Sequence, residues 1–298
     1  MKKIVIGDGG MGSELRFRGV EVPSHIDSIW SALALVENTQ EIKNIHLDYI
    51  DAGAQYITAN NYTVTRPILE RANMGHRMEE LTLLSLSIAR EAIDESGKNV
   101  KLAAALPPLE TSYRADLVLD YSVMQDQYQE LAGILEDKVD IIICETMAHS
   151  SEAHAALTSI QNSKSQKWLG WTLHGNRMNT LPSGENISTA YEAIKELDCD
   201  AYLINCCGVN MVNPSLKELK QLTDKPIGGY ANSEIINTKV DSISNIDAEN
   251  DHWGSATAID EDIYANEVEE WLEQGATIIA GCCRTRPSHI KKLVEMFG

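Results

Sequence analysis

Two pairs of adjacent cysteines are the residues of this chain whose type and spacing point most directly to chemistry. The sequence has six cysteines, and four of them form the pairs Cys206-Cys207 and Cys282-Cys283. A chain without an export signal rarely builds a disulfide framework, so metal binding or catalysis is the hypothesis to pursue. A lone buried cysteine usually acts as a small apolar residue, but two pairs at the ends of two predicted strands favour metal ligands.

Both pairs fall at the C-terminal ends of apolar runs, and such ends converge on one mouth if the strands form a barrel. Adjacent strand residues face opposite ways, although both members of a pair can reach one metal where the strand turns into a loop. We predict that Cys282 and Cys283 are ligands, and we choose Cys206 over Cys207 as the third. Cys207 is then left with a role in packing or in supporting the site.

Three thiolates around a tetrahedral zinc leave the fourth position open, which separates a catalytic site from a closed structural one. The net charge of about −1 makes such a centre a poor Lewis acid for hydrolysis but a good site for a fourth sulfur. A thiol entering the open position loses its proton and becomes a nucleophile at neutral pH. The pattern indicates alkyl transfer to sulfur, from a methyl group on a sulfonium or ammonium whose leaving group becomes neutral.

A barrel hydrolase or lyase would need a metal site rich in histidine or carboxylate. Because only His174 lies near a strand end, we discount this class of enzyme.

The elements that must position these cysteines follow from the pattern of apolar residues. Eight short runs are typical of strands buried on both faces: 4–8, 56–60, 100–106, 140–146, 168–174, 201–207, 226–231 and 276–283. Helical periodicity fills the stretches 34–51, 78–96, 121–138, 151–163, 187–197, 214–223, 262–274 and 287–297. This alternation predicts an α/β protein whose parallel strands close into a (β/α)8 TIM barrel, with a doubly wound open sheet as the alternative.

The spacing is consistent with a single domain over residues 1–298, with an insertion at about 232–261 that is rich in Asn, Ser, Asp and Thr. A second long connection runs from residue 9 to about residue 30. Long βα connections in a barrel lie on the face that carries the active site, so both are candidates for a lid or a donor site. For the insertion, a plain surface loop is the alternative.

The overall charge limits the partners that we expect. With 44 acidic and 25 basic residues the net charge is −19, so a phosphate backbone would be repelled and nucleic acid is not an expected partner. No apolar run approaches the roughly 18 residues that span a bilayer. The apolar stretch at the start of the chain is too short for the apolar region of a secretory signal. We therefore expect no membrane association and a cytoplasmic location.

Motifs spread along the chain resemble those of the homocysteine S-methyltransferases, which include betaine-dependent and S-methylmethionine-dependent enzymes. The matching segments are GDGGMGSEL at 7–15, ITANNY at 57–62, ALPPLETSYRADL at 105–117, CETM at 144–147, INC at 204–206 and AGCCRTRPSHI at 280–290. A GCC triplet followed by Arg-Thr is a specific signature, and the match covers essentially the whole chain.

The resemblance implies a (β/α)8 barrel with one zinc ion held by Cys206, Cys282 and Cys283. It also implies that the carboxylates of Asp8 and Glu145 hold the amino group of homocysteine. Two carboxylates facing an ammonium are a favourable pairing in a partly dehydrated site.

Gly9, from the Asp-Gly-Gly turn, and Asn205, from the Asn-Cys pair, complete the candidate substrate-binding residues. The predicted function is zinc-dependent methyl transfer from a small cationic donor to the thiol of homocysteine, giving methionine. The expected partners are homocysteine and this donor, with assembly into a homo-oligomer left open. The alternatives are another thiol or selenol acceptor, such as selenocysteine, and a non-catalytic zinc-binding barrel.

The identity of the donor stays open among sulfonium and quaternary ammonium compounds. Aromatic rings attract such cations, although core or surface packing is the alternative for each ring. The candidates for an aromatic wall are Trp30, Tyr62, Tyr113 and Trp171.

Overall fold

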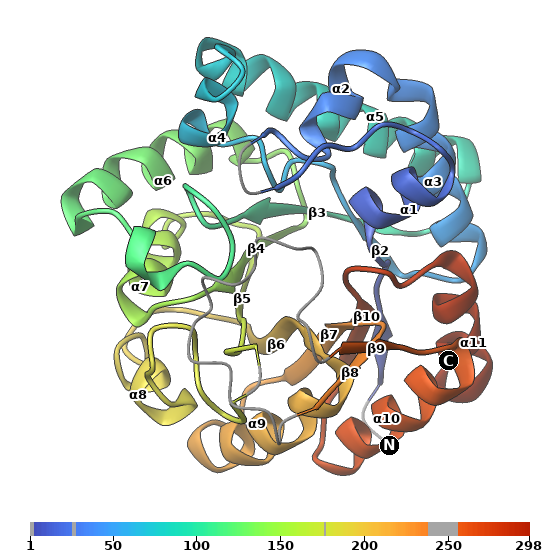
Figure 1. The fold of residues 1–298 in the computed structure, drawn as a ribbon, viewed down its shortest axis with the longest axis vertical. Coiled ribbons are helices and arrows are strands. Elements are labelled where there is room, and N and C mark those ends of the chain that lie inside the picture. Colours follow the sequence, from blue (N-terminus) through green and yellow to red (C-terminus); the bar gives the residue numbers. More distant parts are fainter. Residues whose placement is uncertain (1–2, 26–27, 176, 238–255) are drawn as a thin grey trace.

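The parallel strands of the chain close into a barrel that is surrounded by helices (Figure 1). The computed structural model describes residues 3–25, 28–175, 177–237 and 256–298. The 8-stranded sheet has the order β1-β10-β7-β6-β5-β4-β3-β2, and all its neighbouring strands are parallel. A parallel bridge between Gly7 and Tyr56 joins its two ends. The predicted (β/α)8 barrel is therefore confirmed.

The barrel strands are short and lie where the apolar runs predicted them. Their bounds are β1 Val5–Ile6, β2 Tyr56–Thr58, β3 Lys101–Leu106, β4 Ile141–Met147, β5 Gln166–Trp171, β6 Ala201–Gly208, β7 Ile227–Asn232 and β10 Ile278–Gly281. The eighth strand stops before the second cysteine pair, which lies in the following turn. Thus these two thiols have more freedom of direction than strand residues.

Helices connect the strands and cover the outside of the barrel (Figure 1). They are α1 Met11–Phe17, α2 Ala32–Glu37, α3 Thr39–Asp51, α4 Arg66–Glu70, α5 Met78–Ser96, α6 Tyr121–Leu135, α7 Ser150–Ser159, α8 Ile187–Glu192, α9 Val209–Leu222, α10 Glu261–Glu273 and α11 Pro287–Phe297. Two short 3-10 helices cover Gly75–Arg77 and Ala115–Leu117.

The helices differ from the predictions in several places. The short helices α1 and α4 were not expected, because one or two turns contain too few residues to show a helical period. The single helix predicted over 34–51 is divided at Asn38 into α2 and α3. Helix α9 was expected to begin at Pro214, since proline favours the first helical position. It begins at Val209 instead, directly after β6, and so it contains a proline that removes one intrahelical hydrogen bond.

The predicted insertion begins and ends in a small antiparallel hairpin. Strand β8, Glu234–Ile236, pairs with β9, Ala256–Ala258, and the partners Glu234 and Ala258 mark its base. Residues 238–255 lie outside the described part of the chain, so the lid or donor-site role of the insertion stays a prediction.

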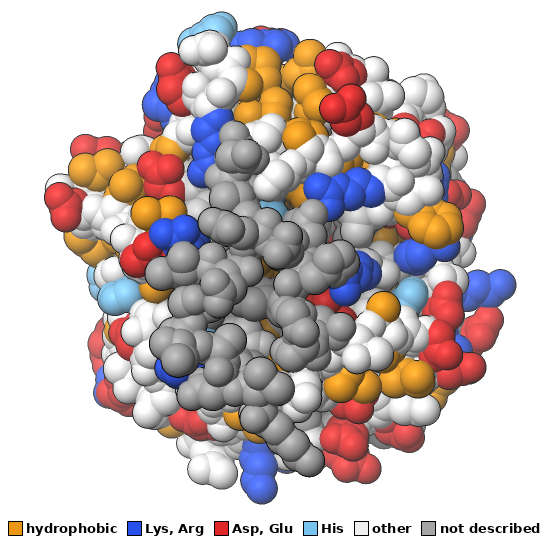
Figure 2. Space-filling view, viewed as in Figure 1, with side chains coloured by type: hydrophobic (Ala, Val, Ile, Leu, Met, Phe, Trp, Pro, Cys, Tyr) orange, Lys and Arg blue, Asp and Glu red, His pale blue; other side chains and the backbone are white. Residues whose placement is uncertain are grey.

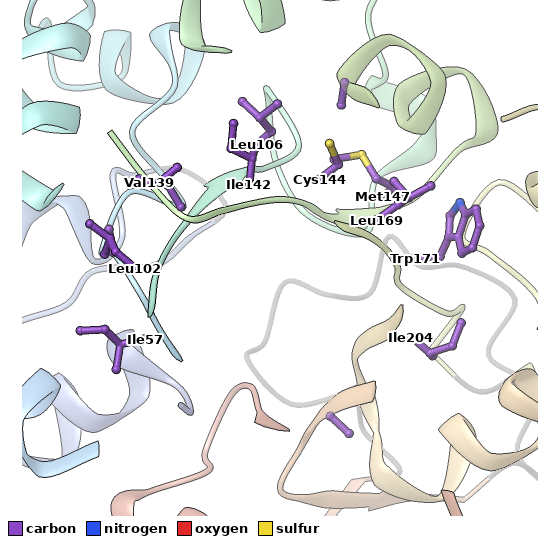
Figure 3. Packing of buried hydrophobic residues seen from close by; sticks show 14 of the residues in the cluster. Ile57, Leu102, Leu106, Val139, Ile142, Cys144, Met147, Leu169, Trp171 and Ile204 are labelled. Atoms are coloured by element: carbon purple, nitrogen blue, oxygen red, sulfur yellow. The ribbon is translucent and has the colours of Figure 1, made fainter. Parts of the chain in front are cut away.

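Alternation along the strands divides the buried residues into two layers. One cluster fills the barrel interior and includes Ile143, Trp168 and Leu203. The next residues in the same strands belong to the larger cluster between barrel and helices, where Cys144 and Leu169 lie (Figure 3). Because successive side chains of a strand point to opposite faces, residues two positions apart share the interior.

Charged side chains of both signs are interspersed among the described residues on the face seen in Figure 2. Among the described residues, no helix combines the length and the apolar character that crossing a membrane requires.

We predict that the outer layer carries much of the stability. Leu169 is fully buried in this layer, whereas Leu117 on the surface is 41% exposed. Leu169→Ala should lower the free energy of unfolding by about 2–5 kcal/mol because it removes buried methyl groups and leaves a cavity. Leu117→Ala, the matched control, should change it by roughly 0.5 kcal/mol or less. Urea denaturation measures both, and equal effects would contradict the two-layer core.

Candidate metal centre and active site

Three cysteine sulfurs meet at the barrel mouth. The Sγ atoms of Cys206, Cys282 and Cys283 lie within 4.8 Å of one another, and no other group of three potential metal ligands of this kind occurs among the described residues. The Cys206 and Cys283 sulfurs are 4.0 Å apart. Tetrahedral zinc with bonds of about 2.3 Å to sulfur needs sulfurs roughly 3.8 Å apart, so the arrangement fits such an ion.

Cys206 reaches the interior because β6 contains an extra residue. The register between β6 and β7 shifts between Asn205 and Gly208, and Cys206 has a φ of 53°. A bulge of this kind re-aims side chains, so Asn205 and Cys206 both face inward. Cys207 then points outward and packs in the outer core, in agreement with the packing role predicted for it.

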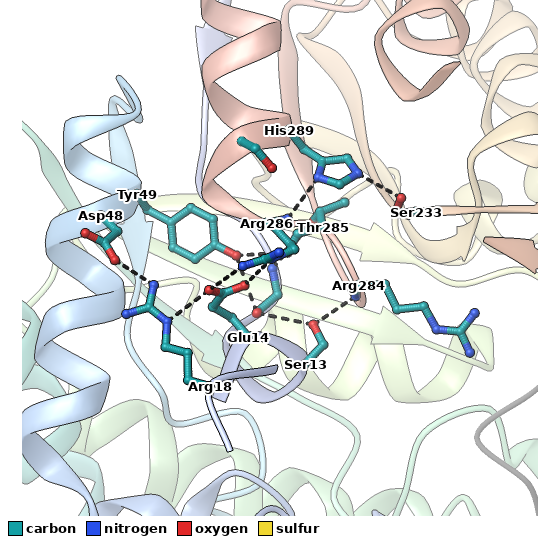
Figure 4. A network of polar contacts seen from close by, with 12 residues as sticks. Ser13, Glu14, Arg18, Asp48, Tyr49, Ser233, Arg284, Thr285, Arg286 and His289 are labelled. Carbon is teal, nitrogen blue, oxygen red and sulfur yellow. Dashed lines mark hydrogen bonds and ion pairs between the residues drawn. The ribbon is translucent and has the colours of Figure 1, made fainter. Parts of the chain in front are cut away.

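A turn with several hydrogen bonds holds the other two cysteines. The amide of Cys282 donates to the carbonyl of Ala231 over 2.8 Å, and the amide of Cys283 donates to Oδ1 of Asn232 over 3.1 Å. Arg284 has a φ of 64°, and its amide donates to Oγ of Ser13 over 2.8 Å. The turn after β10 is therefore bonded to β7 on one side. On the other side it is bonded to α1 through Ser13 (Figure 4).

The Asp-Gly-Gly turn packs against this cysteine turn. The hydroxyl of Thr285 donates to the carbonyl of Cys282 over 2.6 Å and accepts from the amide of Gly10 over 3.2 Å. At Gly9 a Cβ atom would lie 2.7 Å from Oγ1 of Thr285 and 2.8 Å from the hydroxyl of Tyr49. Gly9 is thus required for the close approach of the two turns, and it also lines the cavity.

A buried carboxylate anchors the helices behind these turns. Glu14 of α1 is 1% exposed and pairs with Arg18 and with Arg286, each over 2.9 Å (Figure 4). Arg18 also binds Asp48 of α3 over 2.6 Å. Since Arg286 directly precedes α11, this network connects α1, α3 and α11.

Asp8 and Glu145 are both buried at the cavity wall. Asp8 accepts a hydrogen bond from the amide of Thr58 over 2.7 Å, and Glu145 accepts one from the hydroxyl of Tyr230 over 3.0 Å. Burial raises the pKa of Asp8 to about 7 and that of Glu145 to about 8, because both carboxylates lose contact with water. These hydrogen bonds lower the two pKa values, but by less than desolvation raises them.

The three thiols influence one another's ionisation. Hydrogen bonding to Cys206 and then to Cys282 lowers the pKa of Cys283 well below its usual range, whereas hydrogen bonding to Cys206 raises the pKa of Cys282. The hydroxyl of Tyr113 lies 2.7 Å from Sγ of Cys206. One of the three sulfurs is thus favoured as a thiolate that hydrogen bonds to the other thiols. A borderline-soft cation such as zinc would bind all three sulfurs and displace the remaining thiol protons.

The three thiols, the two carboxylates and Tyr113 line one cavity of about 430 Å³. This volume is within the range of small-molecule sites. The predicted site residues that line the cavity are Asp8, Gly9, Glu145, Cys206, Cys282 and Cys283.

Asn205 is not among the cavity-lining residues. It is fully buried, its Oδ1 accepts from the amide of Thr146 over 3.0 Å, and its Nδ2 donates to the hydroxyl of Thr146 over 2.8 Å. Its assignment as a substrate-binding residue stays a prediction.

Thr58 and Tyr230, which hold the two carboxylates, could not be identified from the sequence, because no local pattern relates residues that lie on different strands. Of the four aromatic candidates, Trp30, Tyr62 and Tyr113 line the cavity. Trp171 does not, since it is the outward residue at the end of β5 and packs in the outer core.

A family model described as homocysteine S-methyltransferase matches residues 5–297. Homocysteine S-methyltransferase YbgG of Bacillus subtilis is 29% identical over 97% of this chain and 93% of its own length. A selenocysteine methyltransferase of Astragalus bisulcatus is 27% identical over 97% of this chain and 91% of its own length.

The fold is also similar to a solved structure, the homocysteine methyltransferase MmuM from Escherichia coli in its metallated form. The two chains are 25% identical and superpose with a TM-score of 0.80, over 99% of this chain and 96% of the other.

We predict that adjacent cysteines of β6 differ in their effect on metal content. Cys206→Ala should abolish stoichiometric zinc binding, because only two of the three sulfurs remain. Cys207→Ala should keep it, since this thiol packs outside the barrel. The zinc content of purified protein after dialysis, measured by plasma mass spectrometry, distinguishes the two. Loss of zinc from Cys207→Ala together with retention by Cys206→Ala would contradict the assignment.

Proposed function

Because this chain belongs to the homocysteine S-methyltransferase family, we propose that it transfers a methyl group from a small cationic donor to the thiol of homocysteine, giving methionine. We further propose that zinc held by Cys206, Cys282 and Cys283 is the cofactor. The activity is assigned to one barrel domain over residues 1–298.

The observation that carries this proposal is the position of three thiols beside two buried carboxylates in a single cavity. An amino acid with a side-chain thiol has an ammonium group for the carboxylates and a sulfur for the metal centre. A closed structural zinc site would have four protein ligands, whereas this group contains three.

Asp8 and Glu145 would bind and orient the amino acid. Both carboxyls are protonated to a substantial degree near neutral pH, because burial raises their pKa values to about 7 and about 8. An incoming ammonium supplies the missing positive charge and favours their ionised forms. Tyr230 and Thr58 keep the two carboxylates in place through their hydrogen bonds.

When bound, zinc would lower the pKa of the substrate thiol so that its sulfur is a thiolate at neutral pH. The sulfur electron pair then forms the new bond to the methyl carbon, and the bond from this carbon to the donor's sulfonium or ammonium breaks. The donor leaves as a neutral sulfide or amine. The contribution of the barrel is to hold the two reactants in line.

A cationic donor fits the character of the cavity. Trp30, Tyr62 and Tyr113 line it, and the faces of such rings attract a sulfonium or a quaternary ammonium. Selenocysteine is a second candidate acceptor, because one relative is named for its methylation and a selenol would use the same sulfur position.

Turnover by purified zinc-loaded protein tests the proposal. Homocysteine is offered with S-methylmethionine, S-adenosylmethionine or betaine, and methionine is measured by mass spectrometry. We expect methionine from at least one donor, no product after removal of zinc by a chelator, and recovery when zinc is restored. Cys282→Ala should remain inactive under both conditions, and Cys207→Ala serves as the matched control.

Undiminished activity after verified removal of zinc would refute the proposed cofactor. A kcat/KM for selenocysteine well above that for homocysteine would change the acceptor, and zinc binding without turnover of any acceptor would favour a non-catalytic barrel.

The pH dependence of amino acid binding follows from the raised pKa values. Below pH 7 both carboxyls of the free protein are protonated and neutral, so attraction to the ammonium is lost, and it returns as pH rises through about 7 to 8. We expect the inhibition constant of methionine, which has the amino group but no free thiol, to fall between pH 6 and pH 8.5. Asp8→Asn should raise it about tenfold at pH 8.5.

In Asp8→Asn the pH dependence should be weaker, because only Glu145 still titrates. An inhibition constant that is independent of pH in the unmodified protein would contradict the assigned role of the carboxylates.

A further inference from the structure

The strands β4 and β6 share an unusual local conformation beside the site. In each strand the register with its neighbour shifts by one residue, between Cys144 and Met147 in β4 and between Asn205 and Gly208 in β6. Thr146 has a φ of 62° and Cys206 a φ of 53°. In both strands the extra residue leaves two successive side chains on the interior face.

Side chains from these two bulges bind each other across the intervening strand β5. Asn205 makes two hydrogen bonds with Thr146, one to its amide over 3.0 Å and one to its hydroxyl over 2.8 Å. Both residues are buried, so neither bond is exchanged for water. The pair joins two strands that are not neighbours in the sheet.

Gly170 of β5 provides the space for this crossing. A Cβ at this position would lie 2.7 Å from Oδ1 of Asn205 and 3.1 Å from the hydroxyl of Tyr230. Tyr230 is the residue that donates to Glu145. Because Gly170 has no side chain, there is room for both the amide of Asn205 and the hydroxyl of Tyr230, which donates to Glu145.

The two bonded residues are chain neighbours of the groups that bind the amino acid. Thr146 directly follows Glu145, and Asn205 directly precedes Cys206. A movement of either bulge would change the separation between the carboxylate and the sulfur. One polar side chain thus connects the two ends of the substrate site.

We propose that Asn205 and Thr146 are a positioning pair that sets the distance between the Glu145 carboxylate and the Cys206 sulfur, in the space left by Gly170. This inference rests on the proposed function, because that function requires one molecule to contact both groups. Asn205 touches neither substrate nor metal in this role. It acts through its two neighbours and holds two left-handed backbone conformations that Thr146 and Cys206 would not keep unaided.

Two substitutions break the pair in different ways. Thr146→Val keeps the shape of the side chain but removes the hydroxyl, which leaves the buried Nδ2 of Asn205 without this acceptor. Gly170→Ala keeps both side chains but places a methyl group 2.7 Å from Oδ1 of Asn205 and 3.1 Å from the hydroxyl of Tyr230, so Asn205 must move. Since the second change does not touch Thr146, the proposal remains testable if the first variant fails to fold.

We expect both variants to raise the zinc dissociation constant, measured by competition with a chromophoric chelator, by about tenfold. The homocysteine KM should rise by a similar factor, and the donor KM should change little. Thr146→Ser, which keeps the hydroxyl, should remain within about twofold of the unmodified protein in both quantities.

Asn61→Ala is the matched control for a general loss of stability. Asn61 is another buried amide, and it makes two hydrogen bonds with Ala105 of β3, over 2.8 and 3.0 Å. This variant should lower the urea midpoint without changing zinc affinity.

The positioning role would be overturned if Thr146→Val and Gly170→Ala both fold and lose stability but bind zinc and homocysteine as the unmodified protein does. In that case the zinc dissociation constant and the homocysteine KM would be unchanged. Failure of the unmodified protein to bind zinc or to turn over homocysteine would instead refute the proposed function, so the two outcomes are distinct.

Discussion

The proposed chemistry depends on three sulfurs from two non-adjacent strands reaching one point. Strand β7 lies between β6, which carries Cys206, and β10, after which Cys282 and Cys283 follow. In a flat sheet, strands two positions apart are separated by about 10 Å. The sulfurs lie within 4.8 Å because a closed barrel directs its interior side chains toward a common axis and because the last two thiols extend from a turn. Closure of the barrel therefore creates the metal centre.

Besides closure of the barrel, the local backbone conformation of β4 and β6 determines which side chains face the interior. Residues with positive φ such as Thr146 and Cys206 cost roughly 1–3 kcal/mol each, and they persist only where the surroundings hold them. Here the surroundings include buried hydrogen bonds to Asn205 and close packing over Gly170. The strain is located where two strands must each present an additional interior side chain. This location connects the stability of the barrel mouth with the geometry of the proposed substrate site.

Two clusters of ionisable groups face the same cavity. Asp8 and Glu145 are buried with raised pKa values, and three thiols compete for few protons at the same cavity. A positive group on each side, an ammonium at the carboxylates and a metal ion at the sulfurs, would offset the desolvation of both clusters. The acceptor that we propose, homocysteine, would contact the carboxylates with its amino group and the metal centre with its sulfur. Its recognition therefore depends on the distance between the carboxylates and the thiols.

The sequence alone determined the barrel, because the alternation of apolar strands and helices is a local property of the chain. Residue type and position at strand ends indicated the cysteines, whereas Asp8 and Glu145 were indicated only by the resemblance to a family. Only the tertiary structure decided that Cys206 turns inward while Cys207 packs outside, because a positive φ reverses the alternation that the strand pattern implies. It also decided the contacts of Tyr230 and Asn205. Such contacts join residues far apart in the chain, and their distances depend on how the closed sheet curves, which no local pattern encodes.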